Sequence, residues 1–207
     1  MRLIVLFSTI LMLYCASRTD SYHTEVLHHN SYLSREQFSN QAILFLPAVN
    51  DSILDSSGVL SANSQADLMQ TLRSDMTICS WSSFERRFLE VFPPRVLTGF
   101  YDNIVGNDIL ALQNSDSLWL HMKCRYLLTL RVVYGARVRT FEGALMRRVR
   151  VETELWDTQR QEIVWRAQTV GKEGDARTTD SRFLKDVILH LFAHLPEYKP
   201  SLNETVW

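Results

Sequence analysis

Within residues 144–157 (ALMRRVRVETELWD), charged residues alternate with apolar or small ones from position 148 to position 155. The uncharged positions are Val149, Val151, Thr153 and Leu155, and the charged positions are Arg148, Arg150, Glu152 and Glu154. Successive side chains of a β-strand point to opposite faces, so this period of two predicts a strand with one face on the core and one in water. A strand of this kind needs partner strands and a layer over its apolar face.

Two further strands are predicted on either side of this one. Residues 124–135 (CRYLLTLRVVYG) precede it, and residues 162–171 (EIVWRAQTVG) follow it after the polar turn DTQRQ. Three successive strands joined by short turns form an antiparallel meander.

The first half of the chain predicts strands and helices in alternation. Residues 42–49 form a continuous apolar run, as expected of a strand buried on both faces. An amphipathic helix is predicted over residues 61–76, with Ser61 or Ser64 as its N-cap. Shorter elements follow: a strand over 76–81, a helix over 82–92 that Pro93 and Pro94 end, and a helix over 101–113.

The last predicted element is an amphipathic helix that Asp180 or Ser181 caps and Pro196 ends. Its apolar stripe consists of Phe183, Leu184, Val187, Ile188, Leu191 and Leu195. The order of elements indicates an α/β fold, with a mixed sheet that ends in an antiparallel meander and is covered by helices, as in an α/β sandwich.

The first residues have the pattern of a secretory signal, because one positive charge precedes an apolar run of about twelve residues and polar residues follow. A membrane-spanning helix needs roughly 20 apolar residues, which is longer than this run. Cys15 stands where a bacterial lipoprotein signal carries its lipidated cysteine, and we prefer this interpretation. Tyr14 occupies the position of the usual small residue, so ordinary cleavage after Ser17 is the alternative, and an uncleaved anchor or a buried strand is the third.

These patterns divide the chain into four parts. We expect residues 1–15 to form the signal with its lipidation cysteine, 16–40 a flexible tether, 41–197 a single α/β domain and 198–207 a C-terminal tail. The part that follows the signal, about 190 residues, is long enough to bury a hydrophobic core without the help of disulfides or metal ions.

Charge and cysteine content limit the choice of partners. The chain has 22 basic and 23 acidic residues, and removal of Arg2 with the signal would leave 21 and 23, a net charge of −2. This balance gives no electrostatic reason to expect a nucleic-acid partner. Cys79 and Cys124 could form a disulfide in an exported protein or could be two buried thiols. Their spacing does not match a zinc site.

The segment LWDTQRQEIVWRAQ, a strand that ends in Asp157 followed by a short turn and Ile163-Val164-Trp165, resembles a hairpin of small periplasmic lipoproteins of the CsgG, LpoB and PelC type. AILFLPAVN and CRYLLTLRV resemble two other strands of that family. The sequence departs from that pattern at two positions. Cys124-Arg125 stands where the family has an acidic residue before the tyrosine, and Gln161 replaces the turn glycine that follows Arg160. The resemblance covers roughly residues 40–196, and it implies a lipidated, non-enzymatic and often oligomeric component of an envelope assembly.

Two groups of residues are candidates for partner binding. Residues 125–150 contain seven arginines and one acidic residue, Glu142, which could form a patch for an anionic lipid, a polysaccharide or an acidic partner. These arginines could instead pair with glutamates across the strands. Arg137 and Arg139 flank a hairpin turn and are expected to be free. Trp156 and Trp119 are candidates for an exposed contact with a partner, whereas the parity of Trp165 places it in the core.

No catalytic motif stands out in the sequence, which contains no GxSxG, Walker or Rossmann glycine pattern. Asp186, His190 and His194 share one face of the last helix, but HLFAH lacks the glutamate of a zincin, so we expect neither a metal nor a cofactor. A solvated polar face is the alternative explanation of these three residues.

We therefore expect a membrane-anchored lipoprotein of the bacterial cell envelope, facing the periplasm. It would act without catalysis as an assembly or accessory component of a secretion, polysaccharide-export or cell-wall system. Its expected partners are copies of itself, envelope proteins and, through the N-terminal lipid, the membrane. The alternative function is that of a soluble exported hydrolase, because a catalytic triad is defined by geometry and not by spacing.

Overall fold

The structure is a computed structural model that describes residues 20–33, 41–51, 60–72, 76–105, 124–139, 141, 143, 145–174 and 178–195. The expected signal with Cys15, Trp119 and the expected C-terminal tail lie outside these residues. No helix within the described residues is long and apolar enough to cross a membrane.

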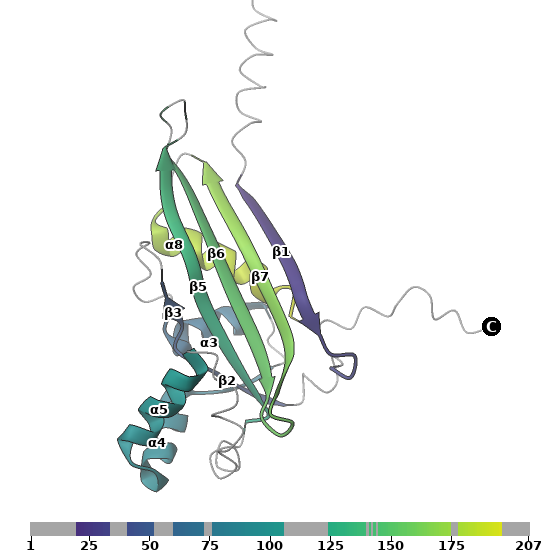
Figure 1. The fold of residues 1–207 in the computed structure, drawn as a ribbon, viewed down its shortest axis with the longest axis vertical. Coiled ribbons are helices and arrows are strands. Elements are labelled where there is room, and N and C mark those ends of the chain that lie inside the picture. The colour runs from purple at the N-terminus through teal and green to yellow at the C-terminus, as the bar shows by residue number, and fades with distance from the viewer. Residues whose placement is uncertain are drawn as a thin grey trace, which may run out of the picture.

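One mixed sheet organises the fold, as the sequence predicts, and in the described residues it has seven strands (Figure 1). Its strands are β1 (Ser21–His29), β2 (Ala42–Phe45), β3 (Val49–Asn50), β4 (Thr77–Cys79), β5 (Tyr126–Arg139), β6 (Leu145–Asp157) and β7 (Glu162–Gly174). The order across the sheet is β1-β7-β6-β5-β2-β4, and β3 pairs with β5. β2 runs parallel to β4 and β5, whereas β5, β6, β7 and β1 are antiparallel neighbours, so the predicted meander is confirmed.

Helices cover the two faces of the sheet unequally. Within the described residues, the helices are α3 (Ala62–Leu72), α4 (Trp81–Val91), α5 (Pro94–Val105) and α8 (Asp180–Phe192). α3 and α8 pack on one face, where they bury the inward side chains of β2, β5, β6 and β7 in the main core. α4 and α5 pack on the opposite face at one end only, against residues such as Leu44 and Leu127. Alternate residues of β2 and β5 therefore enter different cores, which explains their continuous apolar sequence.

Two predicted helix boundaries change. α5 begins at Pro94 and not at residue 101, because proline has no amide hydrogen to lose at the first position of a helix and its fixed φ suits that position. The N-cap of α8 is Thr179, one residue before the predicted caps, and its side chain accepts a hydrogen bond from the Arg182 amide.

The predicted tether contains a strand, which corrects the sequence analysis. Residues 21–29 form β1, which pairs antiparallel with β7 at the edge of the sheet. Thr24 Oγ1 lies 2.7 Å from Thr169 Oγ1, and the Tyr22 ring stacks on His190 of α8 with centroids 4.3 Å apart. Most of β1 is exposed and its inward positions include a threonine, so its sequence lacks the apolar alternation of a core strand.

Cys79 and Cys124 form a disulfide, with their Cα atoms 6.8 Å apart. Cys79 ends β4 and Cys124 lies just before β5, so the bridge closes the segment that contains α4 and α5. Cys124 is buried in the same core as Phe84 and Phe88 of α4. The disulfide therefore fixes this helical pair to the sheet at the end where it packs.

Arg125 and Gln161, which differ from the resembled lipoprotein pattern, both lie at the turn between β6 and β7. The single Nε–H of Arg125 donates a bifurcated hydrogen bond to both oxygens of the buried Asp157 carboxylate, and Nη2 donates a second bond to Oδ2. These hydrogen bonds are the main cause that raises the pKa of Arg125. Asp157 also accepts from the amides of Gln159 and Arg160. Gln161 has φ 56°, a left-handed conformation that costs a residue with a side chain about 1–2 kcal/mol and that glycine adopts freely.

Candidate functional site

The face of the sheet opposite α3 and α8 carries a charged surface, which we call the outer face. Beyond α4 and α5, no described helix covers it. Its side chains come from β1, β5, β6 and β7 and include Glu25, Arg131, Arg150, Glu152, Glu154, Arg166 and Gln168. These are the charged positions of the alternating pattern and their cross-strand neighbours.

Opposite charges pair across the outer face. Arg166 Nη2 lies 2.7 Å from Glu154 Oε1 on the neighbouring strand, and Arg150 Nε lies 3.3 Å from Glu152 Oε1. Each pair of this kind contributes little to stability, about 1 kcal/mol or less. Of the seven arginines in residues 125–150, Arg150 pairs with Glu152 along the same strand, whereas Glu154 pairs across the strands with Arg166, which lies outside that group, so the predicted cross-strand pairing of these arginines is found only in altered form. The result is a surface of alternating sign, and not a uniformly basic patch.

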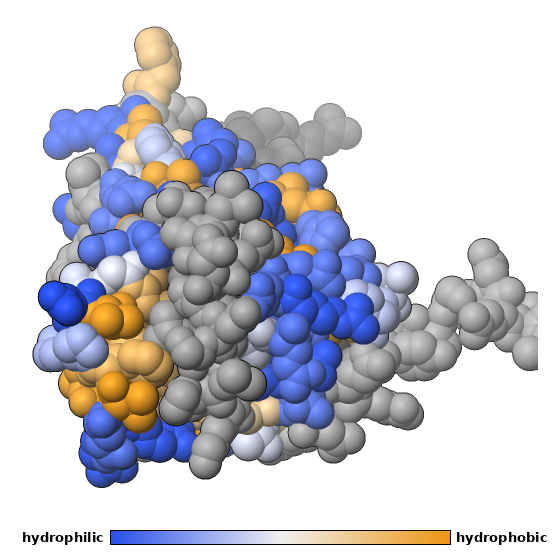
Figure 2. Space-filling view, turned by 60° about the horizontal axis from the view of Figure 1, so that its bottom comes forward, coloured by the Kyte–Doolittle hydropathy of each residue, from blue (hydrophilic) through white to orange (hydrophobic). Residues whose placement is uncertain are grey.

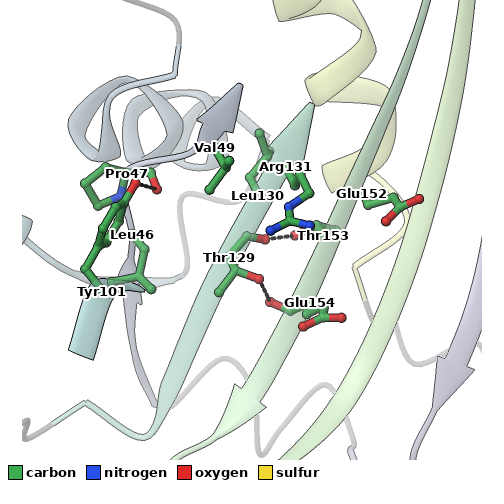
Figure 3. A pocket seen from close by; sticks show the side chains of 10 residues that line it. All are labelled: Leu46, Pro47, Val49, Tyr101, Thr129, Leu130, Arg131, Glu152, Thr153 and Glu154. Atoms are coloured by element: carbon green, nitrogen blue, oxygen red, sulfur yellow. Dashed lines mark hydrogen bonds between the residues drawn. The ribbon is translucent and has the colours of Figure 1, made fainter. Parts of the chain in front are cut away.

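A small cavity lies between the outer face and α5 (Figure 3). Its volume is about 40 Å³, and it is lined by Leu46, Pro47, Val49, Tyr101, Thr129, Leu130, Arg131, Glu152, Thr153 and Glu154. The Tyr101 hydroxyl donates to the Pro47 carbonyl at 3.1 Å, and burial, followed by the charge of Asp102, raises the pKa of Tyr101. Because a ligand pocket occupies roughly 300–1,000 Å³, this cavity can hold a few waters or the end of one partner side chain.

Trp156 does not contact a partner, because it is only 3% exposed. The strand alternation correctly places it on the face of Glu152 and Glu154, but α4 and α5 cover that face at this end, and Trp156 packs with Phe84, Phe88 and Leu127. The sequence gives the parity of a strand residue, whereas it does not show which end of a face a helix will cover. Trp165 lies in the main core, as predicted.

The two predicted hairpin arginines differ. Arg137 is half-exposed but forms an ion pair with Asp180 at the start of α8, so the expectation that it is free is wrong. Arg139 is exposed, and no described carboxylate forms an ion pair with it.

A buried ion cluster, which the sequence analysis missed, joins the β5–β6 hairpin to α8. It consists of Arg147, Glu173 and Asp180, of which Arg147 is 2% exposed. Arg147 Nη1 donates to Asp180 Oδ1 at 2.7 Å, Nη2 pairs with Glu173, and Nη2 also donates to Thr178 Oγ1 at 2.9 Å. The signal was present, because Arg147 has the same parity as the buried Val149 and therefore points inward.

The histidines of α8 do not converge on a metal site. His190 stacks on Tyr22, and His194 Nδ1 lies 2.8 Å from the His190 carbonyl oxygen. Among the described residues, no group of three or more His, Cys, Asp or Glu could hold a metal ion.

Figure 2, in which the end with α4 and α5 comes forward, shows an apolar area on the left, on the side where these helices lie in Figure 1, beside a hydrophilic area. Leu89 and Val91 of α4 are among the exposed large apolar residues, and Val91 is 53% exposed. This end lies opposite the β5–β6 turn.

We predict that Arg147→Met destabilises the protein far more than Arg148→Met. Loss of the Arg147 guanidinium leaves Glu173 and Asp180 buried with fewer partners, at an expected cost of about 3–5 kcal/mol in the free energy of unfolding. The adjacent Arg148 is exposed, so the same substitution there should change this free energy by about 0.5 kcal/mol or less. Urea unfolding of both variants gives the comparison, and equal losses would contradict a structural role of the cluster.

Comparisons with known proteins find structural similarity only. No protein-family model and no curated protein matches the chain. A PelC dodecamer subunit from Paraburkholderia phytofirmans is similar over 86% of this chain and 99% of that one, with 14% identity and a TM-score of 0.46. Lipoprotein GNA1162 from Neisseria meningitidis is similar over 75% of this chain and 99% of that one, with 14% identity and a TM-score of 0.47.

The C-terminal domain of LpoB from Salmonella enterica is similar over 68% of this chain and 86% of that domain, with 13% identity and a TM-score of 0.41. PelC and LpoB are two of the proteins whose strand pattern the sequence resembles, so the structural neighbours include the expected group of small lipoproteins.

Proposed function

We propose that the chain is exported, lipidated at Cys15, and acts without catalysis in the bacterial cell envelope by binding copies of itself and other envelope proteins. The observation that carries this proposal is the outer face, a charged sheet surface over which no described helix lies beyond α4 and α5. The N-terminal sequence supports export, because its charge, apolar length and polar exit match a secretory signal.

The pairing on the outer face supports a protein partner. Positive and negative side chains lie close together on neighbouring strands of this face, at Arg150, Glu152, Glu154 and Arg166. A partner surface with the complementary charges can therefore dock in only one register. Charges at an interface chiefly fix register and exclude wrong partners. A surface that contains both signs can also complement a second copy of itself across a two-fold axis. The cavity beside Tyr101 is too small for a typical substrate, but it can accept one partner side chain.

Lipidation is tested by growing cells that express the wild type or Cys15→Ala with labelled palmitate and then separating membranes from soluble protein. We expect label and membrane association in the wild type and loss of both in the variant. An unlabelled, soluble wild type whose N-terminus lies near Arg18 would contradict lipidation and favour ordinary cleavage.

The outer face is tested by exchanging the partners of one ion pair, Glu154→Arg with Arg166→Glu. The exchange keeps an opposite-charge pair across β6 and β7, so stability should change little, but it inverts the local pattern that a partner meets. We expect the detergent-solubilised wild-type chain to sediment as a multiple of its own mass and the exchanged variant to sediment as a single chain.

The matched control reverses two exposed charges on α8, Arg182→Glu with Lys185→Glu, and should assemble like the wild type. Assembly of the exchanged variant at the wild-type mass would show that the outer face is not the interface between copies.

A further inference from the structure

The β5–β6 hairpin extends beyond the helices that cover the sheet. The ion cluster of Arg147, Glu173 and Asp180 marks the N-terminal end of α8, and the hairpin continues past it toward its turn (Figure 1). The described residues past this point include Val138, Phe141 and Leu145, all of which are exposed, and Phe141 fully so. We call Val138, Arg139, Phe141 and Leu145 the hairpin tip.

Basic residues accompany the exposed apolar ones. Arg139 lies in the hairpin tip, and Arg148 and Lys172 lie directly opposite each other on β6 and β7, a short distance behind it. All three side chains are exposed, and within the part of the chain that the structure describes no carboxylate forms an ion pair with them. Arg137 and Arg147 differ, because Asp180 and Glu173 neutralise them. Three exposed basic side chains therefore lie beside the exposed apolar side chains of the hairpin tip.

The strand register places the start of β1 at the same end of the sheet. Ser21 lies opposite Lys172 on β7, and Lys172 lies opposite Arg148 on β6 (Figure 1). Cys15 precedes Ser21 by six residues, a length of chain that spans at most about 20 Å when fully extended. A lipid on Cys15 would thus hold this end of the sheet, and not the end with α4 and α5, within reach of the membrane.

We propose that the hairpin tip is a second membrane contact, in which Val138, Phe141 and Leu145 enter the lipid interface and Arg139, Arg148 and Lys172 meet anionic phospholipid headgroups. The proposal rests on the proposed lipidation, because Cys15 supplies the attachment near the tip. Apolar side chains with basic neighbours bind at an anionic membrane surface through both burial and charge. The contact would fix the orientation of the domain at the tip end of the outer face, where Arg148 and Lys172 lie, and the part of that face around Glu154 and Arg166 would remain accessible to a partner.

The chain itself provides a selective probe of the tip. Cys79 and Cys124 form a disulfide and Cys15 would be acylated, so Phe141→Cys in the full chain would be the one free thiol. Phe141 is fully exposed, and its replacement should leave the fold intact. The matched control is Val91→Cys, at an exposed apolar position on α4 at the opposite end of the sheet.

Each full-chain variant is labelled with an environment-sensitive fluorophore and reconstituted into vesicles of phosphatidylethanolamine and phosphatidylglycerol that contain a lipid-borne quencher. We expect a blue shift at position 141 and quenching at least about twofold stronger than at position 91. Arg139→Gln with Arg148→Gln, or phosphatidylcholine in place of phosphatidylglycerol, should reduce the quenching at position 141.

Three results would overturn the proposal, and mass spectrometry of Cys15 shows whether lipidation has failed as well. Protein that is acylated and floats with the vesicles, but is equally unquenched at both positions, retains its lipid anchor and lacks the tip contact. Position 141 shielded from water without lipid quenching would assign the tip to a contact between copies. Protein that is not acylated and does not float contradicts lipidation and the tip contact together, whereas unacylated protein with quenching at position 141 supports the tip alone.

Discussion

Burial of the inward face of the β5–β6–β7 meander is the interaction on which the rest of the structure depends. Its apolar residues form the main core with α3 and α8, and the sheet order follows from completing that layer. The length of α8 limits how much of the inward face of the sheet this helix can cover. α8 has 13 residues and spans about 20 Å, whereas β5 has 14 residues and spans roughly 46 Å. One end of the hairpin must therefore project beyond the helix.

The inward positions of the hairpin change character where this cover ends. Val149 and Val151 pack in the core, Arg147 lies in the ion cluster at the start of α8, and Leu145 is exposed. The cluster allows a charged side chain at an inward position because Asp180 and Glu173 supply partners at that point. Beyond it, exposed apolar and basic side chains are available for contacts outside the domain, and the same strands carry the paired charges of the outer face.

The sequence predicts elements whose side-chain period is strong. The alternation in residues 144–157 identifies β6 and both of its faces, and the apolar stripe of residues 183–195 identifies α8. β1 could not be found in this way, because an edge strand that is exposed along most of its length needs little apolar sequence. Trp156 shows a second limit, since its parity is a local property while its burial depends on α4 and α5, which are distant in sequence. Arg147 was predictable from parity, although its partners were not. Cys15 and Trp119 lie outside the described residues and remain predictions.

The pairing of β1 with β7 is the central claim, because it determines the end of the sheet from which the N-terminal segment leaves. Thr24→Cys with Thr169→Cys measures it directly, since the two hydroxyl oxygens lie 2.7 Å apart across the strands. Under mild oxidation, the structure predicts a disulfide between the two peptides that mass spectrometry can identify. Thr24→Cys with Val170→Cys should form no such bond, because Val170 is the next residue of β7 and points to the other face. Absence of the first cross-link would restore residues 16–40 as a tether and would remove the constraint that places Cys15 beside the hairpin tip.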